Sequence, residues 1–585
     1  MKKSEICFIL IFTFFTLVVY PGYSVFGGDH NIYIPQLYKS INPELYPNDT
    51  LFEFSQTSLT HFGDLTIILI NITGLDIFYI FIILAFVTRL VYFYAVYKIS
   101  YYLTNDRKFS LLSSSLLIGG LAIYGTITTT FDIIVQPRPI ALSLCLLFVV
   151  LFWENKRLVS IIPLSLSIFM HPMIALPFLV FFYLSLFIEI LAKRRLSINL
   201  IVSGLIPFLS GILFLARIKG NADLSLFGVI SKEWEAIIRF RNPSFILDWS
   251  YTSFVYLIIS LILFTIAYYG LNRIFTNKEK KNTLLILILT SLGLFVLSFI
   301  TVDLAKLQLF QQFQLSRGLI IPKILITILF AYYTYIQVRE NQKNLLQNMA
   351  FIGIIVSILI KEIMLIIFLP ALILIEIKRY KLKNINFPKN KLFIWFTLLI
   401  PPIALLIFLL TTGMKDRINY LIAIIAFTTI ISIIVYKFGL RINLKYISLV
   451  LLIITILFIS QFTIYPKYYK DKEFIEACNW IKTNTSKSDM FLVQPFSNMS
   501  GQIRIECLRP VFTSGKEGGQ AAFNEEYAKE WKKRFDKILE LEKNKYLIYK
   551  LSEEYNLSYI FSDSNKDLNY SLQFNNTKYF IYKTS

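Results

Sequence analysis

Residues 284–300 read LLILILTSLGLFVLSFI, a run without a single charged side chain. Its length approaches the roughly 20 apolar residues that a helix needs to cross the hydrocarbon core of a bilayer. Similar runs occupy residues 320–335, which are interrupted by Lys323, and residues 447–464. The chain of 585 residues is 56% hydrophobic and only 16% charged, with a mean hydropathy of +0.61. These values predict an α-helical polytopic membrane protein rather than a soluble enzyme.

Basic residues gather in short segments between the apolar runs, and the formal net charge is +21. The clusters lie near residues 98–108, 156–157, 193–195, 278–281, 339–343, 378–391 and 437–445. Charge spread over short loops does not form one basic soluble face, so we expect no nucleic-acid partner. Because Lys and Arg mark cytoplasmic loops, the pattern predicts a multi-pass protein of the inner (cytoplasmic) membrane with about 13–15 hydrophobic helices.

The same rule assigns a side to the N-terminal segments. Residues 1–24 resemble a signal peptide, but no A-x-A cleavage site follows, so we expect a retained first span with a cytoplasmic N-terminus. The next loop, residues 24–64, carries five acidic residues against Lys39 and is predicted to be extracytoplasmic. Residues 349–379 lie between two basic clusters, so both ends of this segment are expected on the cytoplasmic side. This predicts a shallow hairpin broken near Lys361 and Glu362.

The last part of the chain changes character, because charged residues become frequent and long apolar runs stop. We therefore divide the chain into a membrane domain, residues 1–465, and a small extracytoplasmic α/β domain, residues 466–585. Helical spacing predicts helices at 473–483 and 524–543, and short apolar runs predict strands at 489–493, 510–513, 557–561 and 578–582. An outer C-terminal domain follows from the odd number of predicted crossings.

The four cysteines have no metal-binding spacing, and the chain has no H-E-x-x-H, no G-x-S-x-G and no phosphate-binding glycine loop. Cys478 and Cys507 share the C-terminal domain, where a disulfide is one alternative and two free thiols are the favoured one.

Asp29 is the predicted catalytic residue. It follows Gly27 and Gly28 at the end of the first span, and an acid at the mouth of a membrane domain is costly unless it is solvated or functional. His30 and Tyr33 come next and are predicted to bind substrate, since aromatic side chains at the interface suit sugars or headgroups. The alternative is an interfacial loop whose acids only face water.

Further candidate substrate-binding residues lie in other predicted outer turns. Asp132 and Arg138 flank one turn, and an arginine there can bind a phosphate through two hydrogen bonds. His171 tops a second turn, and Lys306 and Arg317 border a third. Anchoring to lipid headgroups is the alternative for the cations, and helix capping is the alternative for the histidine.

These features together resemble the GT-C superfamily of membrane glycosyltransferases. More closely, GGDHNIYIPQLYKSINPELYPNDTLF at residues 27–52 resembles the opening of a bacterial polytopic group that shares this layout. QPRPIAL, FMHPMIALP, WIKTNT, RPVFTSGKEGG and EYAKEW support the resemblance. It implies a polyprenyl-phosphate sugar donor, an acid in the first outer loop as base or metal ligand, and an extracytoplasmic reaction. The sequence lacks the usual D-x-D or E-x-D pair, because Asp29 is followed by His30, so a divalent cation (Mg²⁺ or Mn²⁺) remains open.

Three functions follow as hypotheses. The first is an inverting glycosyltransferase of cell-envelope synthesis, with Asp29 as base and a glycan, lipid or protein as acceptor. The second is a transporter or flippase of lipid-linked glycan, which would need charges along a midplane path. The third is a polysaccharide polymerase or ligase that uses the same donor chemistry.

Overall fold

The structure is a computed structural model. It describes residues 2–18, 21–24, 27–52, 59–118, 120–123, 125–194, 197–218, 225, 227–241, 244–271, 278–340, 471–494, 496–497, 499–543, 547–565 and 570–584. The predicted hairpin at residues 349–379, the apolar run at 447–464 and the basic clusters at 378–391 and 437–445 lie outside these residues. The predicted count of about 13–15 hydrophobic helices falls partly outside them as well.

Most of the described chain is helical, and six of its helices are long and apolar enough to cross a membrane. These helices are α4 (Ile77–Thr104), α8 (Pro172–Lys193), α9 (Ile198–Ile218), α11 (Tyr251–Gly270), α12 (Lys278–Ser298) and α14 (Ile320–Glu340). Three shorter apolar helices are α3 (Phe62–Thr73), α6 (Pro137–Trp153) and α7 (Arg157–Met170). The prediction of several membrane-length apolar helices is confirmed for this part of the chain.

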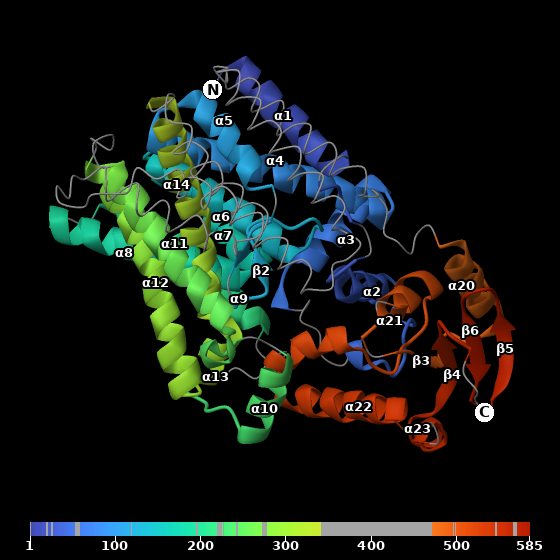
Figure 1. Ribbon diagram of the computed structural model, residues 1–585. Coiled ribbons are helices and arrows are strands. Elements are labelled where there is room, and N and C mark those ends of the chain that lie inside the picture. Colours follow the sequence, from blue (N-terminus) through green and yellow to red (C-terminus); the bar gives the residue numbers. More distant parts are fainter. Residues whose placement is uncertain are drawn as a thin grey trace, which may run out of the picture. The chain divides into compact units, whose positions relative to one another are not determined.

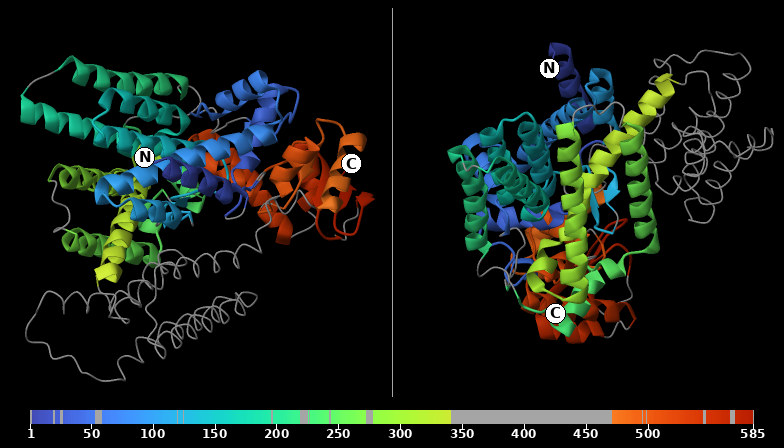
Figure 2. Two further views of the ribbon diagram at one scale, coloured as in Figure 1. Left: turned by 90° about the horizontal axis from the view of Figure 1, so that it is seen from above. Right: turned by 90° about the vertical axis from the view of Figure 1, so that its left-hand side faces the viewer.

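The chain forms two compact units, and the candidate site lies within the first. That unit combines Met1–Phe254, Phe275–Ile324 and Thr463–Ser585, and the second combines Val255–Ile274 and Leu325–Phe462. In the first unit, α1 (Lys3–Val18) packs along α4, and α4 also packs against α5 (Arg107–Leu116) and α6 (Figures 1 and 2).

Ion pairs with basic residues lie at one end of α6 and α8, and candidate site residues lie at the other end. Glu154, just after α6, pairs with Lys98 and with Lys156. Glu189, near the end of α8, pairs with Arg157 and with Lys193. The opposite end of α6 carries Arg138, and the opposite end of α8 carries His171. An α-helix of 17 residues is about 25 Å long, so the ion pairs near Glu154 and the site residue Arg138 lie about that far apart along α6.

The C-terminal residues form a small α/β region around one sheet (Figure 1). The strands β3 (Met490–Leu492), β4 (Leu557–Ser562), β5 (Ser571–Asn575) and β6 (Phe580–Lys583) take the order β3-β4-β6-β5. β3 is parallel to β4, and the other pairs are antiparallel.

Helices cover both faces of this sheet. Consecutive residues of a strand point to opposite faces, and all three residues of β3 are buried. Phe491 packs in a cluster with α20 (Lys472–Asn484). Met490 and Leu492 pack in a second cluster with α22 (Glu525–Lys543) and α23 (Leu547–Tyr555). This arrangement explains why the strand reads as a continuous apolar run rather than an alternating one.

The predicted elements of this region are largely confirmed. Helices α20 and α22 and strands β3, β4 and β6 match predicted segments within a few residues. The predicted strand at residues 510–513 is reduced to a single bridge between Val511 and Phe491. Strand β5 is exposed at four of its five residues and lacks the apolar signal that would have predicted it.

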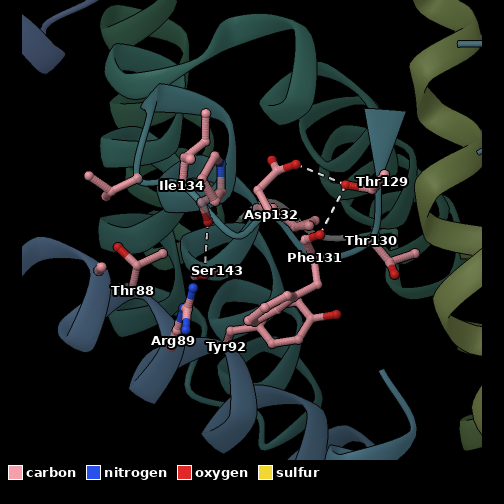
Figure 3. Close-up of a pocket in the computed structure, with 13 residues that line it drawn as sticks. Thr88, Arg89, Tyr92, Thr129, Thr130, Phe131, Asp132, Ile134 and Ser143 are labelled. Carbon is pink, nitrogen blue, oxygen red and sulfur yellow. Dashed lines mark hydrogen bonds between the residues drawn. The ribbon is translucent and has the colours of Figure 1, made fainter. Parts of the chain in front are cut away.

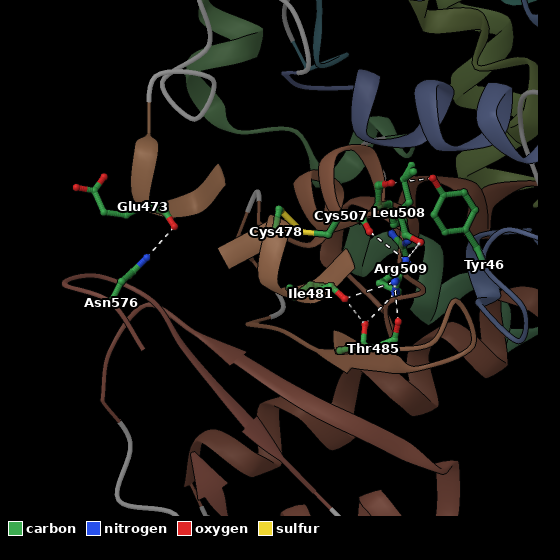
Figure 4. Close-up of a disulfide and its surroundings, with 10 residues drawn as sticks. Tyr46, Glu473, Cys478, Ile481, Thr485, Cys507, Leu508, Arg509 and Asn576 are labelled. Atoms are coloured by element: carbon green, nitrogen blue, oxygen red, sulfur yellow. Dashed lines mark hydrogen bonds between the residues drawn. A yellow bond between two sulfur atoms is a disulfide. The ribbon is translucent and has the colours of Figure 1, made fainter. Parts of the chain in front are cut away.

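A disulfide joins Cys478 in α20 to Cys507, so the prediction that favoured free thiols was wrong (Figure 4). The two residues are 29 positions apart in sequence, and their Cα atoms lie 4.7 Å apart. Arg509, two residues further on, donates to the carbonyls of Ile481 and Thr485 at the end of α20 (Figure 4). Both contacts fix the segment that follows β3 against α20.

Candidate functional site

Asp29 lies at the start of α2 (His30–Ile41), and glycine shapes the turn before it. Gly28 has a φ of +56°, which side chains other than glycine rarely adopt. An aspartate at the first position of a helix normally caps it by accepting from a backbone N–H. The Asp29 side chain makes no such bond, so its carboxylate is available for other partners.

Both oxygens of the Asp29 carboxylate have side-chain partners. Lys516 Nζ lies 2.6 Å from Oδ1, and it comes from the C-terminal region. With the Gln136 amide in the orientation that satisfies its neighbours, its nitrogen donates to Asp29 Oδ2 at 2.7 Å and its oxygen accepts from Arg138 at 2.8 Å. Burial would raise the pKa of Asp29, but the charges of Lys516 and Arg138 outweigh it and hold that pKa below its usual value.

Arg138 is held by Asp132, which the sequence placed at the other end of the same turn. Its Nε lies 2.9 Å from one carboxylate oxygen, and its second nitrogen lies 3.0 Å from the other. Thr129 donates to the same carboxylate at 2.8 Å (Figure 3). This fork fixes the plane of the guanidinium beside Asp29, and Asp132 neutralises its charge.

His171 caps α8 and presents one nitrogen to the site. Its Nδ1 accepts from the backbone N–H of Ile174 at 3.4 Å. Burial lowers the pKa of His171 well below its usual value, and the charges of Arg317 and Arg138 add to this effect. A neutral histidine that accepts at Nδ1 carries its proton on Nε2. His171 therefore offers a neutral N–H donor close to two arginines.

Arg317 and Arg241 are the cations of the site without a carboxylate partner among the described residues. Arg317 contacts the sulfur of Met173 at 3.5 Å, and its buried Nε has no hydrogen-bond partner. It lies within electrostatic range of Asp29, Tyr33 and Arg138. Arg241 donates to the carbonyl of Gly515 at 2.6 Å and also lies within electrostatic range of Asp29.

Tyr33 and His30, both on α2, have different environments. Tyr33 packs edge-on against Phe62, and burial together with the charge of Asp29 raises its pKa. His30 is fully buried, hydrogen-bonds the carbonyl of Val135 at 2.7 Å and packs against Phe81. Burial lowers the pKa of His30 to about 4, so its ring is neutral at neutral pH. These contacts make His30 a core residue that supports the loop.

Lys306 belongs to a separate charge network. Its Nζ lies 2.6 Å from Glu235, which also accepts from Arg239 at 2.8 Å. The Phe245 ring lies beside both cations, and its centre is 4.9 Å from Lys306 Nζ and 3.9 Å from the Arg239 guanidinium. The structure therefore brings together Asp29, Tyr33, Asp132, Arg138, His171 and Arg317, and gives Lys306 a partner elsewhere.

Arg89 is a buried cation that sequence reasoning missed. It lies within the apolar helix α4 and donates to the carbonyls of Thr16, Gly22 and Ile133. It also lines a small cavity beside Asp132 (Figure 3). Because these carbonyls belong to the segments before Asp29 and beside Asp132, Arg89 supports both sides of the site. An arginine inside a membrane-length run is itself the signal that could have found it.

A buried charge network ties the first loop to the C-terminal region next to Lys516. Arg504 binds Asp49 through two hydrogen bonds of 2.8 Å and lies 2.8 Å from Glu517. All three side chains are at most 1% exposed. We call Asp49, Arg504 and Glu517 the clasp. It holds the backbone of Glu517, and therefore of its neighbour Lys516, in place.

The clasp makes stability depend on pH. Burial raises the pKa of Glu517 above its ordinary value of 4.5, although Arg504 opposes this. A group whose pKa is raised on folding stabilises the fold at low pH and loses that contribution as the pH rises through the folded-state pKa. We expect the midpoint of thermal unfolding to fall as the pH rises above 4.5, and Glu517→Gln to flatten this slope. An unchanged slope in that variant would contradict the assignment.

The residues do not fit a divalent cation, which was left open by the sequence. Mg²⁺ and Mn²⁺ take oxygen ligands, yet both Asp29 oxygens have donors and Asp132 is occupied by Arg138. The described residues contain no group of three or more His, Cys, Asp or Glu side chains that could hold a metal. A negatively charged ligand suits the four neighbouring cations, Arg138, Arg241, Arg317 and Lys516, better.

Comparison with known proteins bears on the C-terminal region alone. A family model described as a domain of unknown function (DUF6798) matches residues 472–538. The match runs from α20 into α22 and includes Lys516, Arg504, Glu517 and both disulfide cysteines. No curated protein matches the chain. Fold and site thus define a helical protein with membrane-length apolar helices and an acid among cations contributed by distant segments.

Proposed function

We propose that this protein is a membrane glycosyltransferase of the GT-C kind, which takes a sugar from a polyprenyl-phosphate carrier. The observation that carries the proposal is Asp29 among several cations, two of which have no carboxylate partner among the described residues. Asp29 would accept the proton of the acceptor hydroxyl, whose oxygen attacks the anomeric carbon with inversion. The bond from that carbon to the phosphate oxygen breaks, and its electron pair leaves with the polyprenyl phosphate.

The charges of the site suit this leaving group. A sugar phosphodiester has one negative charge, and the departing phosphate monoester approaches two at neutral pH. Asp132 neutralises Arg138, and Lys516 pairs with Asp29. Arg317 and Arg241 then remain as two positive charges that would stabilise the charge growing on the phosphate. The His171 N–H would add a neutral donor, and Tyr33 would line the sugar side.

The same proposal includes orientation and location. The site and the C-terminal region lie at one end of α6 and α8, and the basic clusters lie at the other. By the positive-inside rule, the site and the C-terminal domain would be extracytoplasmic and the N-terminus cytoplasmic, in the inner membrane. The disulfide supports this side, because disulfides persist in oxidising compartments. The acceptor would be a glycan, a lipid or a protein of the cell envelope.

Arg317 and Lys306 provide the test, because both were predicted phosphate partners and only Arg317 lies beside Asp29. We expect Arg317→Gln to lower kcat/KM for a polyprenyl-phosphate-linked sugar by about a hundredfold, as loss of a donor to a developing anion does. Lys306→Gln should change it less than about threefold, since its partner Glu235 is outside the site. The assay measures product by purified protein in detergent micelles.

The outcome separates the competing functions. Equal rates for wild type and Arg317→Gln would contradict the assigned phosphate site. Movement of the lipid-linked sugar across proteoliposomes without chemical change would identify a transporter instead. A product that carries many sugars rather than one would identify a polymerase that uses the same site.

A further inference from the structure

Lys516 has a fixed backbone and a free side chain. The next residue, Glu517, is buried and bound by Arg504 and by Ser514, each at 2.8 Å. The carbonyl of the preceding residue, Gly515, accepts from Arg241 at 2.6 Å. By contrast, the Lys516 side chain is 42% exposed, and its one ion pair among the described residues is with Asp29. Rotation of this side chain is therefore the motion that can move Nζ without disturbing the clasp.

The ion pair with Lys516 occupies the group that the proposed reaction needs. Asp29 Oδ1 faces Lys516 Nζ at 2.6 Å, and Oδ2 accepts from Gln136. A carboxylate with both oxygens engaged and a lowered pKa is a poor acceptor for the proton of a hydroxyl. Catalysis by Asp29 therefore requires that one of these partners leave. Gln136 is buried at the start of α6, which leaves the more exposed Lys516 as the partner that moves.

A phosphate in the site would compete for the same ammonium group. Arg317 and Arg241 are near Asp29 and have no carboxylate partner within the described part of the chain, so an anion is favoured beside them. Once bound, the donor phosphodiester offers Lys516 one negative charge, as Asp29 does, and that charge grows towards two as the phosphate leaves the sugar.

We propose that Lys516 is an exchangeable counter-ion, which pairs with Asp29 in the empty site and moves to the phosphate of the bound donor. The inference rests on the proposed function and adds regulation to it. The exchange uncovers Asp29 Oδ1 and raises its proton affinity when a donor is present. It therefore imposes an order in which the lipid-linked donor binds before the acceptor is deprotonated. The C-terminal region contributes directly to the site through this residue.

A binding cycle on the full-length protein tests the exchange without relying on catalysis. The probe is a short-chain polyprenyl monophosphate, and the matching polyprenol without phosphate is the control ligand. Dissociation constants are measured for the wild type, Asp29→Asn, Lys516→Gln and the double variant. Asp29→Asn frees Lys516, so it should tighten phosphate binding by roughly fivefold more in the wild-type background than in the Lys516→Gln background.

Asp29 also repels the phosphate directly, and this repulsion is the same in the wild-type and Lys516→Gln backgrounds. The difference between the two backgrounds therefore measures the effect of Lys516 alone. Lys529→Gln is the matched control, because Lys529 lies in the same region, is 43% exposed and pairs with Glu233 and Glu525 away from Asp29. Lys516→Arg should retain phosphate binding because it keeps the charge. An equal effect of Asp29→Asn in both backgrounds overturns the exchange but leaves the donor site intact. Absence of phosphate-dependent binding in every variant overturns the donor site and the exchange together.

Discussion

Asp29→Asn is expected to reduce sugar transfer by about 10²- to 10⁴-fold, the range typical for loss of a general base. The amide has nearly the same shape as the carboxylate, so α2 and the turn at Gly28 should be retained. What it loses is the ability to take the proton from the acceptor hydroxyl. The measurement is kcat for transfer from a polyprenyl-phosphate-linked sugar by purified protein, with donor binding measured separately. We expect kcat to fall and donor binding to persist.

Asp64→Asn is the matched control for this variant. Asp64 is also an acid of the first predicted outer loop, and it pairs with Arg217 at 2.9 Å and with His61 at 2.8 Å. It is 45% exposed, and among the described residues it takes part in none of the contacts around Asp29. We expect its kcat to remain within about threefold of the wild type, since exposed ion pairs contribute little. Transfer by Asp29→Asn at the rate of Asp64→Asn would exclude Asp29 as the base.

Much of the candidate site could be predicted from the sequence because membrane topology restricts the possibilities. Asp29, Arg138, His171 and Arg317 begin or flank apolar helices, and the basic loops assign all of them to one side. A short turn beside an apolar helix leaves its polar residues few positions other than that end of the helix. The structure brings these four residues together within electrostatic range.

The C-terminal contribution to the site could not be predicted in this way. Lys516 reaches Asp29 because the C-terminal region docks on the first loop, and no local pattern encodes that docking. Lys306 shows the converse case, since a cation at the end of an apolar helix predicts a phosphate partner, whereas the fold places Glu235 2.6 Å from its ammonium group. The disulfide could not be predicted for the same reason. The spacing of the two cysteines in the sequence does not show that their Cα atoms approach within 4.7 Å.

Arg504→Met is expected to destabilise the folded protein by about 3–5 kcal/mol, which is the usual cost of leaving a buried charge without its partner. Asp49 would remain buried, and its remaining donors within the described part of the chain would be the backbone N–H groups of Val511 at 2.8 Å and Leu51 at 3.0 Å. The residues of the clasp join the first loop to the C-terminal region. We therefore expect a lower midpoint of thermal unfolding and faster proteolytic release of that region.

Lys487→Gln is the matched control, because Lys487 and Glu44 also join the first loop to the C-terminal region. That pair is 3.3 Å apart, with side chains 54% and 78% exposed, so its loss should cost at most about 1 kcal/mol. Asp49→Asn should recover part of the stability lost in Arg504→Met, because it removes the unpaired charge and keeps an acceptor for Val511. Equal stability of Arg504→Met and Lys487→Gln would mean that the clasp does not hold the two segments together. Transfer activity should fall with docking, since Lys516 reaches Asp29 only from a backbone that the clasp fixes in place.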